Sequence, residues 1–193
     1  MRTSTCPLVG LFAILVFGCA KPVDNVPKQP VLEPTFFLQI DFDHGRIIDL
    51  KDWQLESTLG DSKINLKDFS GKVIVINVWA VHCPGCVKEL PSFRRLINRY
   101  RDRNDIAFFF IGTDRDRDLL REFVENGWAD LPMYQSMDPF PEDFSGGSEP
   151  RIPRTYIIGR KGMLHVDHLG QLEWDNEKVV HLLDSLLADS ASS

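Results

Sequence analysis

The sequence predicts an α/β fold in which a mixed central β-sheet carries helices on both faces. Residues 72–79 and 106–112 are apolar, largely β-branched or aromatic runs of strand length, as expected for strands that are buried on both sides. Each run is followed by a segment with apolar residues at helical spacing. Two more strands and a helix are expected near the C-terminus, so the order is βαβα followed by ββα.

An N-terminal β-hairpin extension is expected ahead of this sheet. One hairpin joins residues 36–42 to residues 46–50 through an Asp-His-Gly turn. A second hairpin joins residues 53–56 to residues 63–66 across a Gly-Asp pair. Gly and Asp between two short apolar runs are typical of hairpin turns.

Two helices are expected between the predicted strands. The first begins at Pro84 and ends near Arg101, and the second runs from Arg117 to Asn126, where Gly127 stops it. The C-terminal strands at residues 155–159 and 163–169 form a further hairpin. These strands are followed by a last helix that ends at Ala188 and that Asp175 is expected to cap.

The first residues are typical of an export signal. Residues 8–17 are almost continuously apolar, but about ten residues are too few to span a bilayer, which needs roughly twenty. The following Val16-Phe17-Gly18-Cys19 resembles the lipobox of bacterial lipoproteins. We therefore expect residues 1–18 to be a lipoprotein signal peptide and Cys19 to carry a lipid. The alternative is an ordinary cleaved signal followed by a chance cysteine.

The segment after Cys19 is expected to be a flexible tether over residues 19–35, because residues 21–34 hold four prolines and no apolar periodicity. Residues 36–193 then form the folded domain. This organisation predicts a periplasmic protein that is lipid-anchored to a bacterial membrane, and it leaves open whether that membrane is the inner or the outer one.

Charge and cysteine content narrow the classes of function. The formal net charge of −6 argues against a nucleic-acid partner, because phosphate binding needs a basic surface. The chain has four cysteines, and if Cys6 leaves with the signal and Cys19 is lipidated, only Cys83 and Cys86 remain. A single close pair cannot form a disulfide framework, but it can be oxidised outside the cytoplasm.

The chemistry is expected at Cys83-Pro84-Gly85-Cys86, where a strand meets a helix. Unsatisfied N–H groups and the dipole at a helix start favour a thiolate at Cys83. Residues three apart on a helix are neighbours, so Cys86 can form a disulfide with Cys83. We expect Cys83 to attack a substrate disulfide and Cys86 to resolve the mixed disulfide, without a cofactor.

Three other interpretations of this pair compete with the redox one. A zinc site needs two more ligands, and the sequence has no second CxxC. A structural disulfide would close a loop too short to add much stability. A copper-binding module would use Cys83, Cys86 and a histidine, with His165 and His168 as candidates. The redox interpretation is favoured, and no metal is expected.

Two stretches resemble the membrane-tethered thioredoxin-like proteins of the TlpA/ResA type, a group that includes the cytochrome c maturation reductases. The first stretch is residues 71–80 (GKVIVINVWA), followed by the CxxC and by Glu89-Leu90-Pro91. The second is residues 151–158 (RIPRTYII), followed by Lys161-Gly162. The resemblance covers roughly residues 53–188. It implies a thioredoxin fold and a thiol–disulfide oxidoreductase.

The resemblance also implies roles for individual residues. Ile152–Pro153 would be a cis bond that faces the CxxC and pairs with substrate, whereas from the residues alone Pro153 could start an edge strand. Glu89, three residues past Cys86, would exchange a proton with the resolving thiol if burial raises its pKa, and a solvated helix charge is the alternative. Asn77 stands where cytoplasmic thioredoxins carry a buried aspartate, which leaves Glu89 as the acid/base candidate.

The chain departs from this family at His82, where tryptophan usually precedes the first cysteine. A protonated His82 would stabilise the thiolate of Cys83 and meet the substrate together with Ile152 and Pro153; an exposed histidine without a role is the alternative. The Pro-Gly dipeptide between the cysteines is also uncommon in the family, which leaves the direction of electron flow open. Two tryptophans near the site are expected to be buried core residues, Trp79 and Trp174.

These observations together predict an enzyme that reduces disulfides in exported proteins. By resemblance, its substrates are apocytochrome c or metal-centre assembly factors, and its electrons come from a membrane thiol donor. A disulfide oxidase or isomerase on the same scaffold is the alternative, because the reduction potential depends on how well the thiolate is stabilised.

Overall fold

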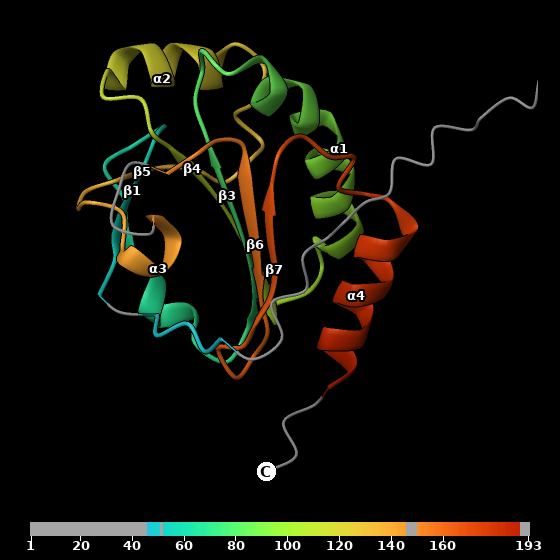
Figure 1. Ribbon diagram of the computed structural model, residues 1–193. Coiled ribbons are helices and arrows are strands. Elements are labelled where there is room, and N and C mark those ends of the chain that lie inside the picture. The colour runs from blue at the N-terminus through green and yellow to red at the C-terminus, as the bar shows by residue number, and fades with distance from the viewer. Residues whose placement is uncertain (1–45, 51, 146–149, 190–193) are drawn as a thin grey trace, which may run out of the picture. The chain divides into compact units, whose positions relative to one another are not determined.

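The computed structural model describes residues 46–50, 52–145 and 150–189 (Figure 1). The expected signal peptide at 1–18, the lipidated Cys19, the tether at 19–35 and the first strand of the first hairpin lie outside these residues. Among the residues that are described, no helix is long and apolar enough to cross a membrane.

The centre of the domain is a mixed β-sheet. Its seven strands are β1 (Gln54–Ser57), β2 (Lys63–Asn65), β3 (Val73–Trp79), β4 (Ile106–Gly112), β5 (Met133–Ser136), β6 (Arg154–Ile158) and β7 (Leu164–Leu169). They are ordered β2-β1-β5-β4-β3-β6-β7. Strands β3, β4 and β5 run parallel, and the other neighbouring pairs are antiparallel. The predicted α/β class with a mixed sheet is therefore confirmed.

Helices cover both faces of this sheet, as predicted. The described helices are α1 (Pro84–Tyr100), α2 (Arg117–Glu125), α3 (Glu142–Ser145) and α4 (Glu177–Ala188), with a short 3-10 helix, η1 (Leu66–Phe69). Phe93 of α1 packs edge-on against Phe110 of β4, and Phe144 of α3 packs edge-on against Tyr156 of β6. Phe110 and Tyr156 pair with consecutive residues of β3, so they point to opposite faces of the sheet.

The buried strand β3 positions the functional site. All seven of its residues are buried, and it lies between β4 and β6. The chain leaves β3 at Trp79 and enters α1 at Pro84, so the CxxC lies at the carboxyl end of a central strand (Figure 1). This is the edge of an open α/β sheet at which active sites are commonly built.

The N-terminal extension is confirmed in part. Strands β1 and β2 form the second predicted hairpin. In the described part of the first predicted hairpin, Ile47 makes an isolated bridge to Met163, and the Ile48 N–H donates to the Gly162 carbonyl at 2.8 Å. Residues 46–48 therefore run along the start of β7.

Two details of the prediction were wrong. Strand β5 was not predicted, because Met133–Ser136 is a four-residue half-buried segment whose order comes from pairing with β4 and β1. Asp175 does not cap the last helix, since its carboxylate accepts hydrogen bonds from Arg95. Asn176 caps the helix instead, and its side chain accepts from the N–H groups of Lys178 and Val179.

Candidate active site

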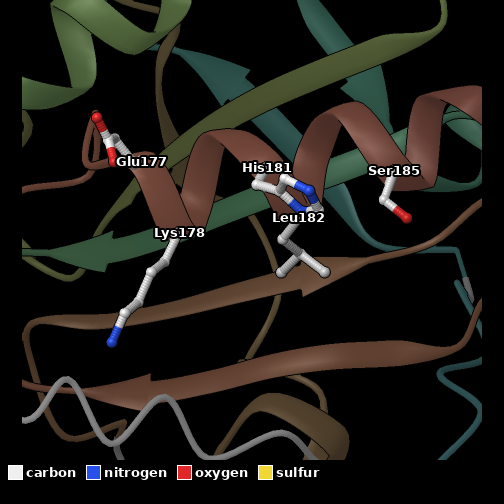
Figure 2. A pocket seen from close by; sticks show the side chains of 5 residues that line it. All are labelled: Glu177, Lys178, His181, Leu182 and Ser185. Carbon is white, nitrogen blue, oxygen red and sulfur yellow. The ribbon is translucent and has the colours of Figure 1, made fainter.

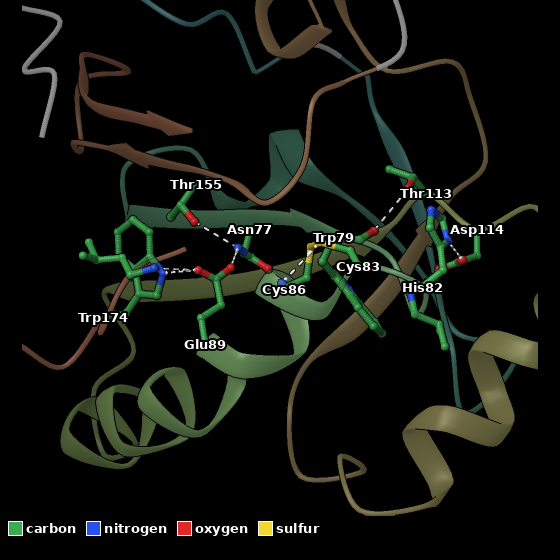
Figure 3. Close-up of a disulfide and its surroundings, with 12 residues drawn as sticks. Asn77, Trp79, His82, Cys83, Cys86, Glu89, Thr113, Asp114, Thr155 and Trp174 are labelled. Atoms are coloured by element: carbon green, nitrogen blue, oxygen red, sulfur yellow. Dashed lines mark hydrogen bonds and ion pairs between the residues drawn. A yellow bond between two sulfur atoms is a disulfide. The ribbon is translucent and has the colours of Figure 1, made fainter. Parts of the chain in front are cut away.

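Cys83 and Cys86 form a disulfide at the N-terminus of α1, with their Cα atoms 5.3 Å apart (Figure 3). Cys83 is the N-cap residue of the helix, and its sulfur accepts a hydrogen bond from the Cys86 N–H at 3.2 Å. Pro84 occupies the first helical turn, as predicted. The helix start therefore directs an N–H group at the sulfur that would become the attacking thiolate.

The two cysteines differ in exposure. Cys83 is 9% exposed, whereas Cys86 is completely buried. Cys83 is therefore the more accessible cysteine of the pair. Because the disulfide forms within one helical turn, the two sulfurs are within reach of each other without a backbone rearrangement.

The loop before β6 lies beside the CxxC. The Ile152–Pro153 peptide bond is cis, as the family resemblance implied. A Cβ atom added at Gly85 would lie 3.8 Å from Pro153 Cδ, so the two segments lie close together at this point. The Pro153 carbonyl accepts a hydrogen bond from the Gly170 N–H at 2.9 Å, which ties this loop to the segment after β7.

Glu89 lies one turn beyond Cys86 and is completely buried, so the alternative of a solvated helix charge is wrong. Its Oε1 accepts from Asn77 Nδ2 at 2.8 Å. Its Oε2 accepts from the Leu172 N–H at 3.2 Å and from the Trp174 indole N–H at 2.9 Å. Burial raises the pKa of Glu89 to about 7, and the three hydrogen bonds limit the rise. The carboxyl group can therefore gain or lose a proton near neutral pH.

Asn77 connects Glu89 to the strands. Its Nδ2 donates both to Glu89 and to Thr155 Oγ1, the latter at 2.9 Å. Asn77 lies on β3 and Thr155 faces it on β6. This buried polar group therefore joins α1 to two central strands, to one side of the disulfide (Figure 3).

His82 lies on the other side of the CxxC (Figure 3). Its side chain is 74% exposed, and its Nδ1 lies 3.1 Å from Asp114 Oδ1. The second Asp114 oxygen accepts from the Val81 N–H at 2.8 Å, so one buried carboxylate binds both residues before Cys83. His82 therefore has a partner, although its ring is open to solvent.

Trp79 and Trp174 are both completely buried, as predicted. Trp79 packs against Phe123 of α2, with ring centroids 5.3 Å apart. Trp174 stacks on Phe93, but it also donates to Glu89, so it belongs both to the core and to the site.

The histidines of the copper alternative do not join the cysteines. His165 lies against Gly159, at the opposite end of β6 from the CxxC, and His168 pairs with Thr155 on the adjacent strand. Within the described ranges, no three His, Cys, Asp or Glu side chains gather where they could hold a metal ion. This arrangement therefore does not supply the third ligand that a copper module needs.

Surface hollows lie away from the cysteines. One of about 450 Å³ lies on the outer face of α4, where it is lined by Glu177, Lys178, His181, Leu182 and Ser185 (Figure 2). Another of about 360 Å³ adjoins the β6–β7 turn at the end of the sheet opposite the CxxC. Neither of these two hollows includes a predicted site residue.

Sequence reasoning missed four contacts at the site. Leu172 and Trp174 lie more than 80 residues from Glu89, and no local pattern points to them. Thr155 likewise reaches Asn77 only through strand pairing. Asp114 had a usable signal, because it follows β4 just as His82 follows β3, and the carboxyl ends of neighbouring parallel strands meet at one edge.

The chain is similar to proteins named as thioredoxin-like or as thiol-disulfide oxidoreductases. The thioredoxin-like protein YneN of Bacillus subtilis is 28% identical over 116 residues, which cover 60% of this chain and 66% of YneN. The thiol-disulfide oxidoreductase ResA of Bacillus thuringiensis is 27% identical over 104 residues, which cover 54% of this chain and 58% of ResA. The chain thus matches less than two thirds of the length of each of these relatives.

The fold has solved counterparts. The structure of a thiol:disulfide interchange protein of the thioredoxin family from Chlorobium tepidum superposes with a TM-score of 0.61. It is 17% identical, and the match covers 72% of this chain and 97% of that one, which supports the predicted thioredoxin fold. The resemblance to ResA-type proteins is confirmed by the curated relatives. The family model described as Redoxin matches residues 46–183, and the chain therefore belongs to the Redoxin family.

Proposed function

We propose that this protein is an extracytoplasmic thiol–disulfide oxidoreductase that reduces disulfides in exported proteins. The observation that carries the proposal is the Cys83–Cys86 disulfide at the start of α1, with Cys83 9% exposed and Cys86 completely buried. The relatives named thiol-disulfide oxidoreductase and the solved thiol:disulfide interchange protein support the same chemistry.

The reaction transfers two electrons by thiol–disulfide exchange. The Cys83 thiolate attacks one sulfur of the substrate disulfide, which forms a mixed disulfide and releases the other substrate sulfur as a thiolate. The Cys86 thiol loses its proton, and its sulfur attacks Cys83. The Cys83–Cys86 disulfide forms, and the second substrate sulfur leaves as a thiolate. A dithiol donor then reduces the pair by the reverse exchange.

Glu89 is proposed to hold the proton of Cys86 during this cycle. It lies one helical turn beyond Cys86, it is buried, and its pKa is raised to about 7. Its carboxylate would accept the proton when Cys86 attacks Cys83, and its carboxyl would return the proton when the disulfide is reduced. Cys83, Cys86 and Glu89 are thus the proposed catalytic residues.

The substrate is proposed to lie over Cys83, between the cis-proline loop and His82. Pro153, which follows Ile152, lies close to Gly85 of the CxxC, and the exposed His82 precedes the proposed nucleophile. Because Asp114 binds Nδ1 of His82, the imidazole is oriented on the side of the cysteines away from Glu89 (Figure 3).

The proposed setting follows from the sequence. Export and lipidation of Cys19 would attach the domain to a bacterial membrane, where a membrane thiol donor can supply electrons. Apocytochrome c or metal-centre assembly factors are the proposed substrates, by resemblance to ResA-type proteins. A role as a disulfide oxidase or isomerase is the competing proposal, and the reduction potential separates the two.

The first experiment measures that potential on the full chain, by equilibration in dithiothreitol or glutathione buffers. A reductase is expected near the potential of thioredoxin, about −270 mV, whereas oxidases and isomerases lie at about −120 to −180 mV. A value in the second range would refute the reductive proposal.

The second experiment traps the intermediate. Cys86→Ser cannot resolve the mixed disulfide, so it should accumulate adducts with disulfide-bearing exported proteins on Cys83. Cys83→Ser is the matched control and should form none. Adducts of equal yield in both variants would contradict the assignment of Cys83 as nucleophile.

A further inference from the structure

The segment that follows β7, residues 170–174, runs along α1, with Gln171 near Gly85 and the Trp174 N–H bonded to Ser92. Two N–H groups of this segment converge on one oxygen of Glu89: the Leu172 backbone donates at 3.2 Å and the Trp174 indole at 2.9 Å. Figure 3 shows the indole directed at the carboxylate. The segment thus supplies two of the three donors to a carboxylate that belongs to another element.

Trp174 is held in place from several sides. The backbone N–H of Trp174 donates at 2.9 Å to the Oγ of Ser92, which lies one turn after Glu89 on α1. Its ring stacks on Phe93, with centroids 5.1 Å apart and planes at 14°. On β7, the ionisable ring of His168 packs edge-on against it at 5.7 Å. The direction of the indole N–H is therefore fixed before Glu89 ionises.

We propose that Leu172 and Trp174 are positioning residues for Glu89, holding its carboxylate beside the turn that carries Cys86 so that it can exchange a proton with the resolving thiol. This inference rests on the proposed function and adds a part of the site that the CxxC pattern does not contain. Leu172 and Trp174 are proposed to act through Glu89, to which both donate.

The pKa of Glu89 is set by a balance between burial and hydrogen bonding. Burial disfavours the carboxylate, while the donors from Trp174, Asn77 and Leu172 favour it, and the pKa settles at about 7. The groups that shift this pKa are all uncharged, and the ionisable neighbours are the Cys86 thiol on α1 and His168, which contacts Trp174. Without the indole donor, the carboxylate loses a charge-assisted hydrogen bond and the proton is held more tightly.

The test compares Trp174→Phe with Trp79→Phe in the full-length chain. Phenylalanine at 174 keeps a ring to stack on Phe93 but removes the N–H. Trp79 is the matched control, because it is equally buried and its indole nitrogen has no hydrogen-bond partner among the described residues. We expect Trp174→Phe to raise the pKa of Glu89 by about one unit or more, as read from its carboxyl ¹³C resonance. Trp79→Phe should leave that pKa unchanged.

A kinetic readout accompanies the spectroscopic one. The pH at which resolution of the mixed disulfide is half-maximal should move upward with the pKa of Glu89 in Trp174→Phe, about tenfold in proton concentration per unit. The proposal would be overturned if the two substitutions moved the Glu89 pKa and the half-maximal pH equally, or if Trp174→Phe moved neither.

A measurement on the unaltered protein tests the same proposal without requiring that the substituted chains fold. The indole N–H resonance of Trp174 should titrate with the same midpoint as Glu89, whereas the resonance of Trp79 should not. A Trp174 resonance that stays constant through pH 7 while the Glu89 carboxyl titrates would refute the proposal that Trp174 positions Glu89. Such a result would leave the oxidoreductase proposal standing if thiol exchange is still seen, and absence of exchange in the unaltered protein would refute that proposal separately.

Discussion

The burial of Glu89 has a consequence for stability that Glu89→Gln should reveal. An acid whose pKa is higher in the folded than in the unfolded chain binds protons preferentially in the folded state. The folded chain is then favoured at low pH, and stability is lost as the pH rises from the unfolded towards the folded pKa. For Glu89 this interval runs from the reference value of 4.5 to about 7.

The magnitude follows from the pKa. One pKa unit corresponds to about 1.4 kcal/mol, so the rise of Glu89 from 4.5 to about 7 makes ionisation about 3 kcal/mol more costly in the folded chain. The free energy of unfolding should therefore fall by about 3 kcal/mol across this interval and level off above it. Glutamine cannot ionise, so the loss should be absent in Glu89→Gln.

The assay is urea denaturation of the oxidised protein at a series of pH values, without reductant so that Cys83 and Cys86 remain bonded. The quantity to compare is the difference in unfolding free energy between the two chains as a function of pH. Acids with lowered pKa values, such as Asp105 and Asp175, titrate in both chains and cancel in this difference. A difference that stays constant between pH 5 and about 8 would refute the reasoning.

Two further substitutions test contacts elsewhere in the fold. Asp105→Asn removes the partner of Arg103 and Arg160, whose bonds hold the pKa of Asp105 well below its usual range. It should cost about 1 kcal/mol at neutral pH, and this cost should decrease as the pH falls below 3.8, which denaturation at several pH values can check. Gly112→Ala would place a Cβ atom 2.9 Å from a Leu120 methyl group, so it should lower the unfolding free energy by about 1–3 kcal/mol. Gly60→Ala meets nothing within 4 Å and should change it by less than about 0.5 kcal/mol in the same urea titrations; equal costs at the two positions would contradict the steric argument.

The parts of the fold that the sequence predicted are those with strong local periodicity. Strands β3 and β4 are apolar runs apart from Asn77, and α1 carries its apolar residues on one face, so their predicted bounds agree within a residue or two. Strand β5 lacks such a run and is ordered by its two neighbours. The capping error at Asp175 has a similar origin, because the competing partner, Arg95, lies 80 residues away.

In the candidate site, too, local spacing predicted some features, whereas others depend on residues far away in the sequence. Cys83 and Cys86 are separated by one helical turn, so their spacing alone fixes their relative placement and the contact of one with the N–H of the other. The local spacing of Glu89 was compatible with both a solvated charge and a proton carrier. The environment of Glu89 depends on Trp174 and Leu172, which donate to its carboxylate from 85 and 83 residues away along the chain.

The nucleophile and the buried carboxyl differ in how many segments of the chain are needed to build them. A thiolate at a helix start is stabilised by groups of its own turn, so the nucleophile can be specified by four consecutive residues. A buried carboxyl that titrates near neutrality needs desolvation and a limited number of donors at once, and no single segment can supply both. In this protein α1 provides the carboxyl, β3 one donor and the segment after β7 the other two. A change in that distant segment can therefore alter proton transfer at Cys86 while leaving the CxxC intact.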